Sequence, residues 1–142
     1  MIQSATPQWK TEPFEVGAPR NSILIVDDDH DQVFCLRERL QNLGFETIAA
    51  HRGDAALDLA ENEHPDLVLL DLRLPDANGL DVCSRLSDSP STWDIPVIIL
   101  SAVEGPDIIR SSRAAGCTFF VRKPYDPNAL LALIECSLHD EN

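Results

Sequence analysis

Four short, mostly apolar runs in this chain each end at a charged or hydroxyl-bearing residue. The runs are residues 23–26, 67–70, 97–100 and 119–122, and the residues that follow them are Asp27, Asp71, Ser101 and Lys123. An apolar, β-branched run of this length is typical of a strand that is buried on both faces of a parallel sheet. Because the carboxyl ends of parallel strands share one edge, where such sheets bind ligands, we expect these polar side chains to meet there.

Helical patterns follow each of these runs and one further short run. Leu, Val and Ile residues recur at helical spacing, and Gly44 and Gly116 mark helix ends. The expected strands are residues 23–26, 46–50, 67–70, 97–100 and 118–122, and the expected helices lie near residues 33–43, 55–60, 80–86, 108–115 and 126–138. Five strands that alternate with five helices predict an α/β fold, with helices on both faces of a parallel sheet. The pattern by itself does not order the strands.

The charge of the chain limits its partners. Its 142 residues suit one domain, and the net charge of −13 opposes binding to nucleic acid or to an anionic membrane surface. The N-terminus lacks the apolar region of a signal peptide, and no apolar stretch is long enough to span a bilayer. The cysteines fall within helical or strand patterns, which favours small buried thiols and a reducing, cytoplasmic location; they are Cys35, Cys83, Cys117 and Cys136.

Residues 1–20 differ from the rest of the chain. Pro7, Pro13 and Pro19 interrupt them, and no helical or strand period survives. We therefore expect an N-terminal extension over 1–20, flexible or lying against the domain, and a folded domain over 21–142. Because the sequence stops soon after the last expected helix, we expect either a single-domain protein or a domain excised from a longer one.

The carboxylates expected at the sheet edge favour a divalent metal ion. Asp27, Asp28 and Asp71 would repel one another unless a cation lay between them. Mg²⁺ suits this place because it is a hard cation that binds one or two carboxylates together with water. An Asp that follows a strand is more often a helix cap, and this alternative suits Asp29 well.

Lys123 and Ser101 each allow two interpretations. Pro124 restricts the backbone of Lys123 to extended geometry, which could aim the ammonium at Asp71 or at a phosphate oxygen. The alternative for Lys123 is a solvated strand end. The hydroxyl of Ser101 could donate to a phosphoryl oxygen, or Ser101 could be a simple turn or cap residue.

In order and spacing, these segments resemble the receiver domain of two-component response regulators. The resemblance covers about residues 22–138. It rests on the pieces Ile23-Leu24-Ile25-Val26-Asp27-Asp28-Asp29, Asp71-Leu72-Arg73-Leu74-Pro75-Asp76-Ala77-Asn78-Gly79, Leu100-Ser101-Ala102 and Lys123-Pro124-Tyr125. It implies a flavodoxin-like, doubly wound sheet of five parallel strands in the order 2-1-3-4-5.

The resemblance also implies roles for the matching residues. The positions of Mg²⁺ ligands are held by Asp28 directly, by Asp27 through water, and by Asp71 and the backbone carbonyl of Arg73. The phosphoryl acceptor would be Asp71, with Ser101 and Lys123 beside the phosphoryl group. Ser101 and Phe120 match the switch positions of the family, and the Lys123–Pro124 bond would be cis.

Departures from the family pattern are mild. Leu74 stands where Met is common and Asn78 where Asp is common, and neither touches the expected chemistry. Arg73 and Val103 flank the acceptor at positions that vary across the family. Val103 has no polar group to orient an attacking water, and bulky Arg73 could shield the phosphoryl group. We therefore expect slow self-hydrolysis.

The implied function is that of a switch. A histidine kinase or a histidine phosphotransfer protein would phosphorylate Asp71, and this would favour a second conformation of the domain. The surface of the fourth helix, the fifth strand and the fifth helix would change, and it would bind a downstream protein or a second copy of the chain.

Three alternatives compete with this interpretation. A docking module that works without phosphorylation is the main one. A phosphatase with an Asp nucleophile is disfavoured, because Arg73 stands where a second Asp is usual, so we expect no enzyme that acts on external substrates. A flavodoxin-like cofactor binder is disfavoured because the edge lacks a Gly-, Ser- or Thr-rich phosphate loop.

Overall fold

Strands and helices alternate along the chain as the sequence predicts. The structure is a computed structural model that describes residues 21–103 and 105–139, so the expected N-terminal extension lies outside the described residues. The described strands are β1 (Ser22–Val26), β2 (Glu46–Ala50), β3 (Leu67–Asp71), β4 (Val97–Ser101) and β5 (Phe119–Arg122). The helices are α2 (His30–Asn42), α3 (Gly53–Glu63), α4 (Gly79–Asp88), α5 (Pro106–Ala114) and α6 (Pro127–His139).

The strands form a parallel sheet in the order β2-β1-β3-β4-β5 within the described residues. β1 is an interior strand, because Val26 pairs with Ala50 of β2 and with Leu70 of β3. β3 and β4 each extend one residue further than the apolar run predicts and include Asp71 and Ser101. The order is that of a flavodoxin-like, doubly wound sheet. The predicted fold class and strand order are therefore confirmed.

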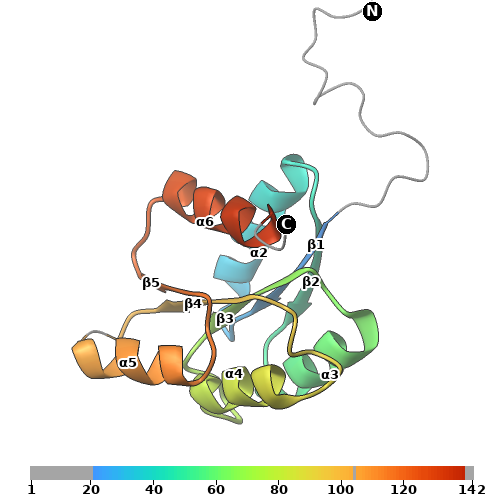
Figure 1. The fold of residues 1–142 in the computed structure, drawn as a ribbon. Coiled ribbons are helices and arrows are strands. Elements are labelled where there is room, and N and C mark those ends of the chain that lie inside the picture. Colours follow the sequence, from blue (N-terminus) through green and yellow to red (C-terminus); the bar gives the residue numbers. More distant parts are fainter. Residues whose placement is uncertain (1–20, 104, 140–142) are drawn as a thin grey trace, which may run out of the picture.

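Helices cover both faces of the sheet (Figure 1). On one face, α2 and α6 pack through residues such as Leu40 and Ile134 against alternate strand residues such as Ile25. On the other face, α3, α4 and α5 pack against the intervening strand residues, for example Leu24 and Val68. Each fully buried Leu or Ile side chain stabilises the fold by about 1.5–3 kcal/mol, so this double burial explains why the strands are almost wholly apolar.

Helix caps fix the loops that surround the carboxyl edge of the sheet. Oδ1 of Asp29 accepts from the amides of Asp31 at 3.0 Å and Gln32 at 3.2 Å, which confirms the cap interpretation of Asp29. The N-cap residue of α3, Arg52, makes no side-chain cap hydrogen bond. A carboxylate from another loop, that of Asp76, accepts from the first amides of α3 instead. This explains why α3 begins before the segment that its own sequence predicts.

The prediction of four small buried thiols is wrong for two cysteines. Cys83 is buried and Cys117 is half-buried, whereas Cys35 and Cys136 are exposed, and all four are free thiols. Cys35 and Cys136 lie in helices but outside the apolar stripes that pack on the sheet. Burial raises the pKa of Cys83 to about 12, which makes its thiolate scarce and its thiol unreactive.

Candidate functional site

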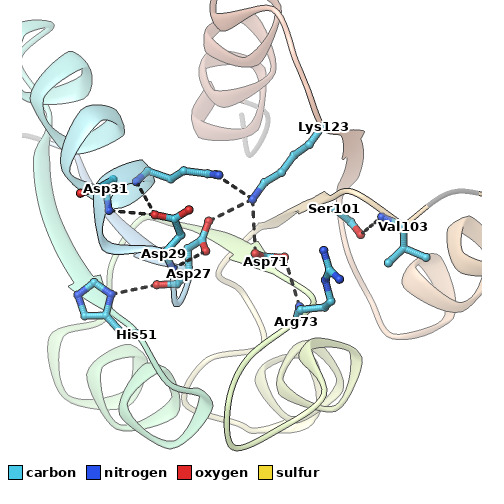
Figure 2. A network of polar contacts seen from close by, with 10 residues as sticks. Asp27, Asp29, Asp31, His51, Asp71, Arg73, Ser101, Val103 and Lys123 are labelled. Carbon is cyan, nitrogen blue, oxygen red and sulfur yellow. Dashed lines mark hydrogen bonds and ion pairs between the residues drawn. The ribbon is translucent and has the colours of Figure 1, made fainter.

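The carboxyl ends of four strands meet at one edge of the sheet, and the expected polar residues meet with them (Figure 2). Asp27 directly follows β1, Asp71 and Ser101 are the last residues of β3 and β4, and Lys123 directly follows β5. The parallel register aligns these strand ends, since Asp71 pairs with Leu100 of the neighbouring strand. Residues that are up to 96 positions apart in the sequence thereby form one site.

Three carboxylates cluster at this edge. One oxygen each of Asp27, Asp28 and Asp71 lies within 4.8 Å of the other two. Asp27 is buried, Asp71 is half-buried and Asp28 is exposed, so the cluster opens to solvent on one side. Hard oxygen donors at this spacing fit the preference of Mg²⁺ for carboxylates together with water. The residues that the sequence predicts as carboxylate ligands are therefore brought together.

The ammonium of Lys123 lies among these carboxylates. Its Nζ is 3.1 Å from Oδ2 of Asp27 and 3.4 Å from Oδ2 of Asp71. Nζ also donates to Oε1 of Gln32 at 3.1 Å. The Lys123–Pro124 peptide bond is cis, as the resemblance implies. The alternative in which Lys123 is a solvated strand end is therefore wrong.

Burial and the ion pair between Lys123 and Asp71 act in opposite directions on the pKa values of these two residues. Burial raises the pKa of Asp71 above its ordinary value; Lys123 and the Arg73 amide oppose this rise, and the neighbouring Asp27 adds to it. Burial acts to lower the pKa of Lys123, but the carboxylates of Asp71 and Asp27 outweigh it, so this pKa lies above its ordinary value. The ammonium is thus held in its charged form beside a carboxylate that is costly to ionise.

Ser101 is buried and takes part in the loop that leaves β4. Its Oγ accepts from the amide of Val103 at 3.0 Å, which is the contact expected of a turn residue. Its carbonyl oxygen accepts from the amide of Lys123 at 2.8 Å and so joins the ends of β4 and β5. Phe120 lies one strand away, where it pairs with Ile99 and is half-buried against the core under α3, α4 and α5.

Sequence reasoning missed the contacts that support this site. Nδ1 of His51 lies 2.9 Å from the carbonyl oxygen of Asp27, and the ring of His51 stacks on His30 with centroids 3.7 Å apart. Oδ1 of Asp27 accepts from the amide of Asp29 at 3.0 Å. Gln32 stands in the first turn of α2, and no pattern in the sequence distinguishes it from other exposed helix residues. These contacts hold the loop between β1 and α2 in place.

The loop that follows Asp71 folds back tightly on β3. The amide of Gly79 donates to the carbonyl of Leu72 at 2.8 Å, and Arg73 and Asn78 form an antiparallel bridge. A Cβ at position 79 would lie 2.5 Å from Cα of Leu72, so this close approach requires glycine. Within the loop, the amide of Arg73 donates to Oδ1 of Asp71 at 3.2 Å and orients its carboxylate.

A groove between α2 and α6 opens beside the site. Its volume is about 1160 Å³, and Lys123 and Tyr125 lie at one end of it. The apolar side chains that line it along the two helices include those of Leu36, Leu43 and Leu131. The groove therefore joins an apolar surface to the polar edge of the sheet.

Comparison with known proteins identifies this arrangement. Residues 23–135 match the family model of the response regulator receiver domain. The chain belongs to this family. The matched residues include the whole carboxylate cluster, Ser101 and Lys123, so the receiver family and the candidate site cover the same part of the chain.

Similar proteins agree with this assignment. The polar-differentiation response regulator DivK of Brucella ovis is 34% identical over 119 residues, which are 84% of this receiver and 97% of DivK. The BeF3-activated receiver domain of RstA from Klebsiella pneumoniae shares 28% identity and a TM-score of 0.79, over 84% of this chain and 99% of that one. A CheY-like receiver domain protein from Methanospirillum hungatei is 27% identical, with a TM-score of 0.81, over 86% of this chain and 96% of that one.

The helices of this receiver are short. Among the residues that the structure describes, none of them is long and apolar enough to cross a membrane.

Proposed function

We propose that this receiver accepts a phosphoryl group on Asp71 from a phosphohistidine of a histidine kinase or a phosphotransfer protein. The observation that carries the proposal is the meeting of Asp71 with two further carboxylates and with the ammonium of Lys123. A nucleophilic oxygen, a countercharge and the hydroxyl-bearing Ser101 lie at the same edge of the sheet. Membership of the receiver family supports the proposal, because receivers of two-component systems interact with such donors.

In the proposed transfer, an oxygen of Asp71 attacks phosphorus and the bond between phosphorus and the donor imidazole breaks. The imidazole leaves with the electron pair of that bond. The amide of Arg73 holds the other carboxylate oxygen at 3.2 Å, so the nucleophile is oriented before the donor arrives. Lys123 shifts its ammonium from the carboxylates to a phosphoryl oxygen. Such a transfer needs positioning and charge neutralisation more than covalent assistance from the protein.

The carboxylates of Asp27, Asp28 and Asp71, with the carbonyl of Arg73, are the proposed Mg²⁺ ligands. When bound, the ion neutralises charge on the phosphoryl oxygens. The donor set fits, because all of its members are oxygens and the three carboxylates lie within 4.8 Å of one another. Without a cation, Asp27 and Asp28 repel an incoming phosphoryl dianion.

The proposed output is a shift between two conformations. The hydroxyl of Ser101, which here accepts from Val103, turns to donate to a phosphoryl oxygen. This movement frees the loop after β4 and leaves space that the ring of Phe120 can enter. The surface formed by α5, β5 and α6 is then repacked, and we propose that it binds a downstream protein or a second copy of the chain.

The proposal includes no turnover of external substrates. Slow self-dephosphorylation is the only reaction beyond phosphoryl acceptance, because Arg73 and Val103 offer no base to an attacking water. The net charge of −13 supports protein partners over nucleic acid. A cytoplasmic location is part of the proposal, since two-component phosphoryl donors act there.

The test is transfer of a radioactive phosphoryl group from an autophosphorylated histidine kinase. We expect labelling of the wild-type protein with Mg²⁺, none in excess chelator, and none of Asp71→Asn. Persistent labelling of Asp71→Asn would place the acceptor elsewhere. If no donor labels the protein and BeF3⁻ with Mg²⁺ leaves its NMR spectrum unchanged, the protein is a phosphorylation-independent docking module instead.

A further inference from the structure

We propose that Asp76 is a positioning residue for the metal site and acts by clamping the loop that follows Asp71 to the start of α3. The inference rests on the proposed function, because this loop carries the Arg73 carbonyl that matches a Mg²⁺ ligand. Asp76 itself does not belong to the cluster of Asp27, Asp28 and Asp71. Its effect on the metal therefore passes through the backbone of the loop.

The clamp consists of two hydrogen bonds between distant segments. Oδ1 of Asp76 accepts from the amide of Gly53 at 2.6 Å, and Oδ2 accepts from the amide of Asp54 at 3.0 Å. These amides open α3, whose own N-cap residue Arg52 provides no side-chain acceptor. The first amides of a helix need an acceptor, and a carboxylate there is also favoured by the helix dipole. Asp76 supplies both the acceptor oxygens and the negative charge, although it lies 23 positions after Gly53 in the sequence.

Steric fit keeps the loop and the helix in contact. A Cβ at position 53 would lie 2.9 Å from Cβ of Ala77 and 3.1 Å from Cγ2 of Val82. Only glycine allows the loop to approach α3 this closely without displacement. Arg52 adds an ion pair to the loop, since its Nη2 lies 3.7 Å from Oδ2 of Asp76. A second, local ion pair joins Nε of Arg52 to Oδ1 of Asp54 at 3.1 Å. The hydrogen bonds thus join the loop to α3, and the missing side chain of Gly53 permits their close approach.

The base of the loop is closed, so the clamp contributes to where Arg73 lies. Arg73 and Asn78 form a bridge, and the amide of Gly79 donates to the carbonyl of Leu72 at 2.8 Å. Asp76 is at the turn between the two bridged residues. Because the ring of backbone from Arg73 to Asn78 is short and closed, displacement at Asp76 displaces Arg73 as well. Loss of the clamp is therefore expected to misplace the Arg73 carbonyl.

The test is the dissociation constant of Mg²⁺, measured by titration calorimetry with magnesium chloride at constant ionic strength. Groups that orient metal ligands typically change metal affinity by about 10- to 100-fold, so we expect Asp76→Ala to raise the dissociation constant about tenfold. Asp76→Asn keeps an acceptor for Gly53 and loses the one for Asp54. We therefore expect the dissociation constant of Asp76→Asn to lie between those of wild type and Asp76→Ala, whereas a pure charge effect would give the two variants equal dissociation constants.

Asp66→Ala is the matched control. Oδ2 of Asp66 also accepts a long-range backbone hydrogen bond, from the amide of Ser22 at 2.8 Å, but at the opposite edge of the sheet. The Mg²⁺ dissociation constant of Asp66→Ala should stay within about twofold of the wild-type value, since Asp66 orients no metal ligand. The inference is overturned if Asp76→Ala binds Mg²⁺ like wild type, if both Asp76 variants weaken binding equally, or if Asp66→Ala weakens binding as much. If Asp76→Ala does not fold, unchanged binding by Asp76→Asn overturns it.

A second readout separates this inference from the proposed function. In Mg²⁺-free protein, Asp76→Ala should shift the amide NMR signals of Arg73 and Leu74, whereas Asp66→Ala should leave them in place. Wild-type protein that fails to bind Mg²⁺ contradicts the proposed function, whatever Asp76 does. Wild-type protein that binds Mg²⁺, with unshifted Arg73 and Leu74 signals in Asp76→Ala, contradicts the role of Asp76 alone.

Discussion

Nζ of Lys123 lies 3.4 Å from Oδ2 of Asp71, although the two residues are 52 positions apart in the chain. The same ammonium lies 3.1 Å from Oδ2 of Asp27. The strand ends of β1, β3 and β5 bring these groups together, and the sheet order decides which strands they are. The site therefore carries its own countercharge before any phosphoryl group arrives.

The first prediction concerns stability and pH. The pKa of Asp71 in the folded protein lies above its ordinary value of 3.8 because of burial, so the folded state binds this proton more tightly than the unfolded state. In Mg²⁺-free buffer the free energy of unfolding should therefore fall as the pH rises from about 4 through the raised pKa of Asp71. Urea unfolding at a series of pH values measures this.

Two variants make that measurement specific. Asp71→Asn should lack the fall, while Asp88→Asn, which removes an exposed carboxylate from α4, should keep it. Lys123→Ala should steepen the fall, because the ammonium opposes the rise in the pKa of Asp71. The same pH slope in wild type and Asp71→Asn would contradict the account of the electrostatics.

The lifetime of the phosphoryl group gives the second prediction. Val103 is exposed and apolar, and Arg73 is exposed beside the acceptor (Figure 2). Val103→Glu should speed the decay of phosphorylated protein by ~10-fold, which is within the ~100-fold that a positioned base can supply. Arg73→Asn should also speed it by removing a shield. Val103→Ala is the control and should decay like wild type; equal decay rates for all variants would refute slow hydrolysis by these residues.

The groove between α2 and α6 gives the third prediction. We expect a phosphodonor protein to dock in this groove. Leu131→Glu should then slow transfer from the donor by ~10-fold or more, because a charge buried without a partner in that interface costs well over ~1.4 kcal/mol. Acetyl phosphate needs no docking surface, so its transfer rate should not change. Trp93→Glu replaces an exposed apolar residue that precedes β4 at the other edge of the sheet, and should leave both rates unchanged. Equal loss with both phosphodonors would exclude a docking role.

A buried hydroxyl in α5 gives the fourth prediction. Oγ of Ser112 is buried and has no hydrogen-bond partner within the described part of the chain. Ser112→Ala should raise the free energy of unfolding by about 1 kcal/mol, since it removes an unsatisfied polar group. Ser111→Ala changes an exposed residue of the same helix and is the control. It should gain only the smaller stabilisation that alanine gives through its higher helix propensity, which Ser112→Ala also gains. Chemical denaturation of both variants compares them, and equal gains would show that Ser112 carries no such cost.

Much of the fold and of the site follows from the sequence, because both depend on patterns that repeat. The strand before Asp71 is apolar at every position, and a polar residue at its end must lie at the sheet edge. Gln32 and Asp76 could not be predicted, because each acts through long-range contacts that leave no period in the sequence. The exposure of Cys35 was missed for a related reason: one residue beside an apolar stripe can face either way.

The most direct test of the central claim is the mass of the protein after incubation with acetyl phosphate and Mg²⁺. The account predicts that wild-type protein gains the mass of one phosphoryl group, that peptide mapping places it on Asp71, and that chelator or Asp71→Asn prevents it. A phosphoryl group on another residue, or equal modification of Asp71→Asn, would contradict the account.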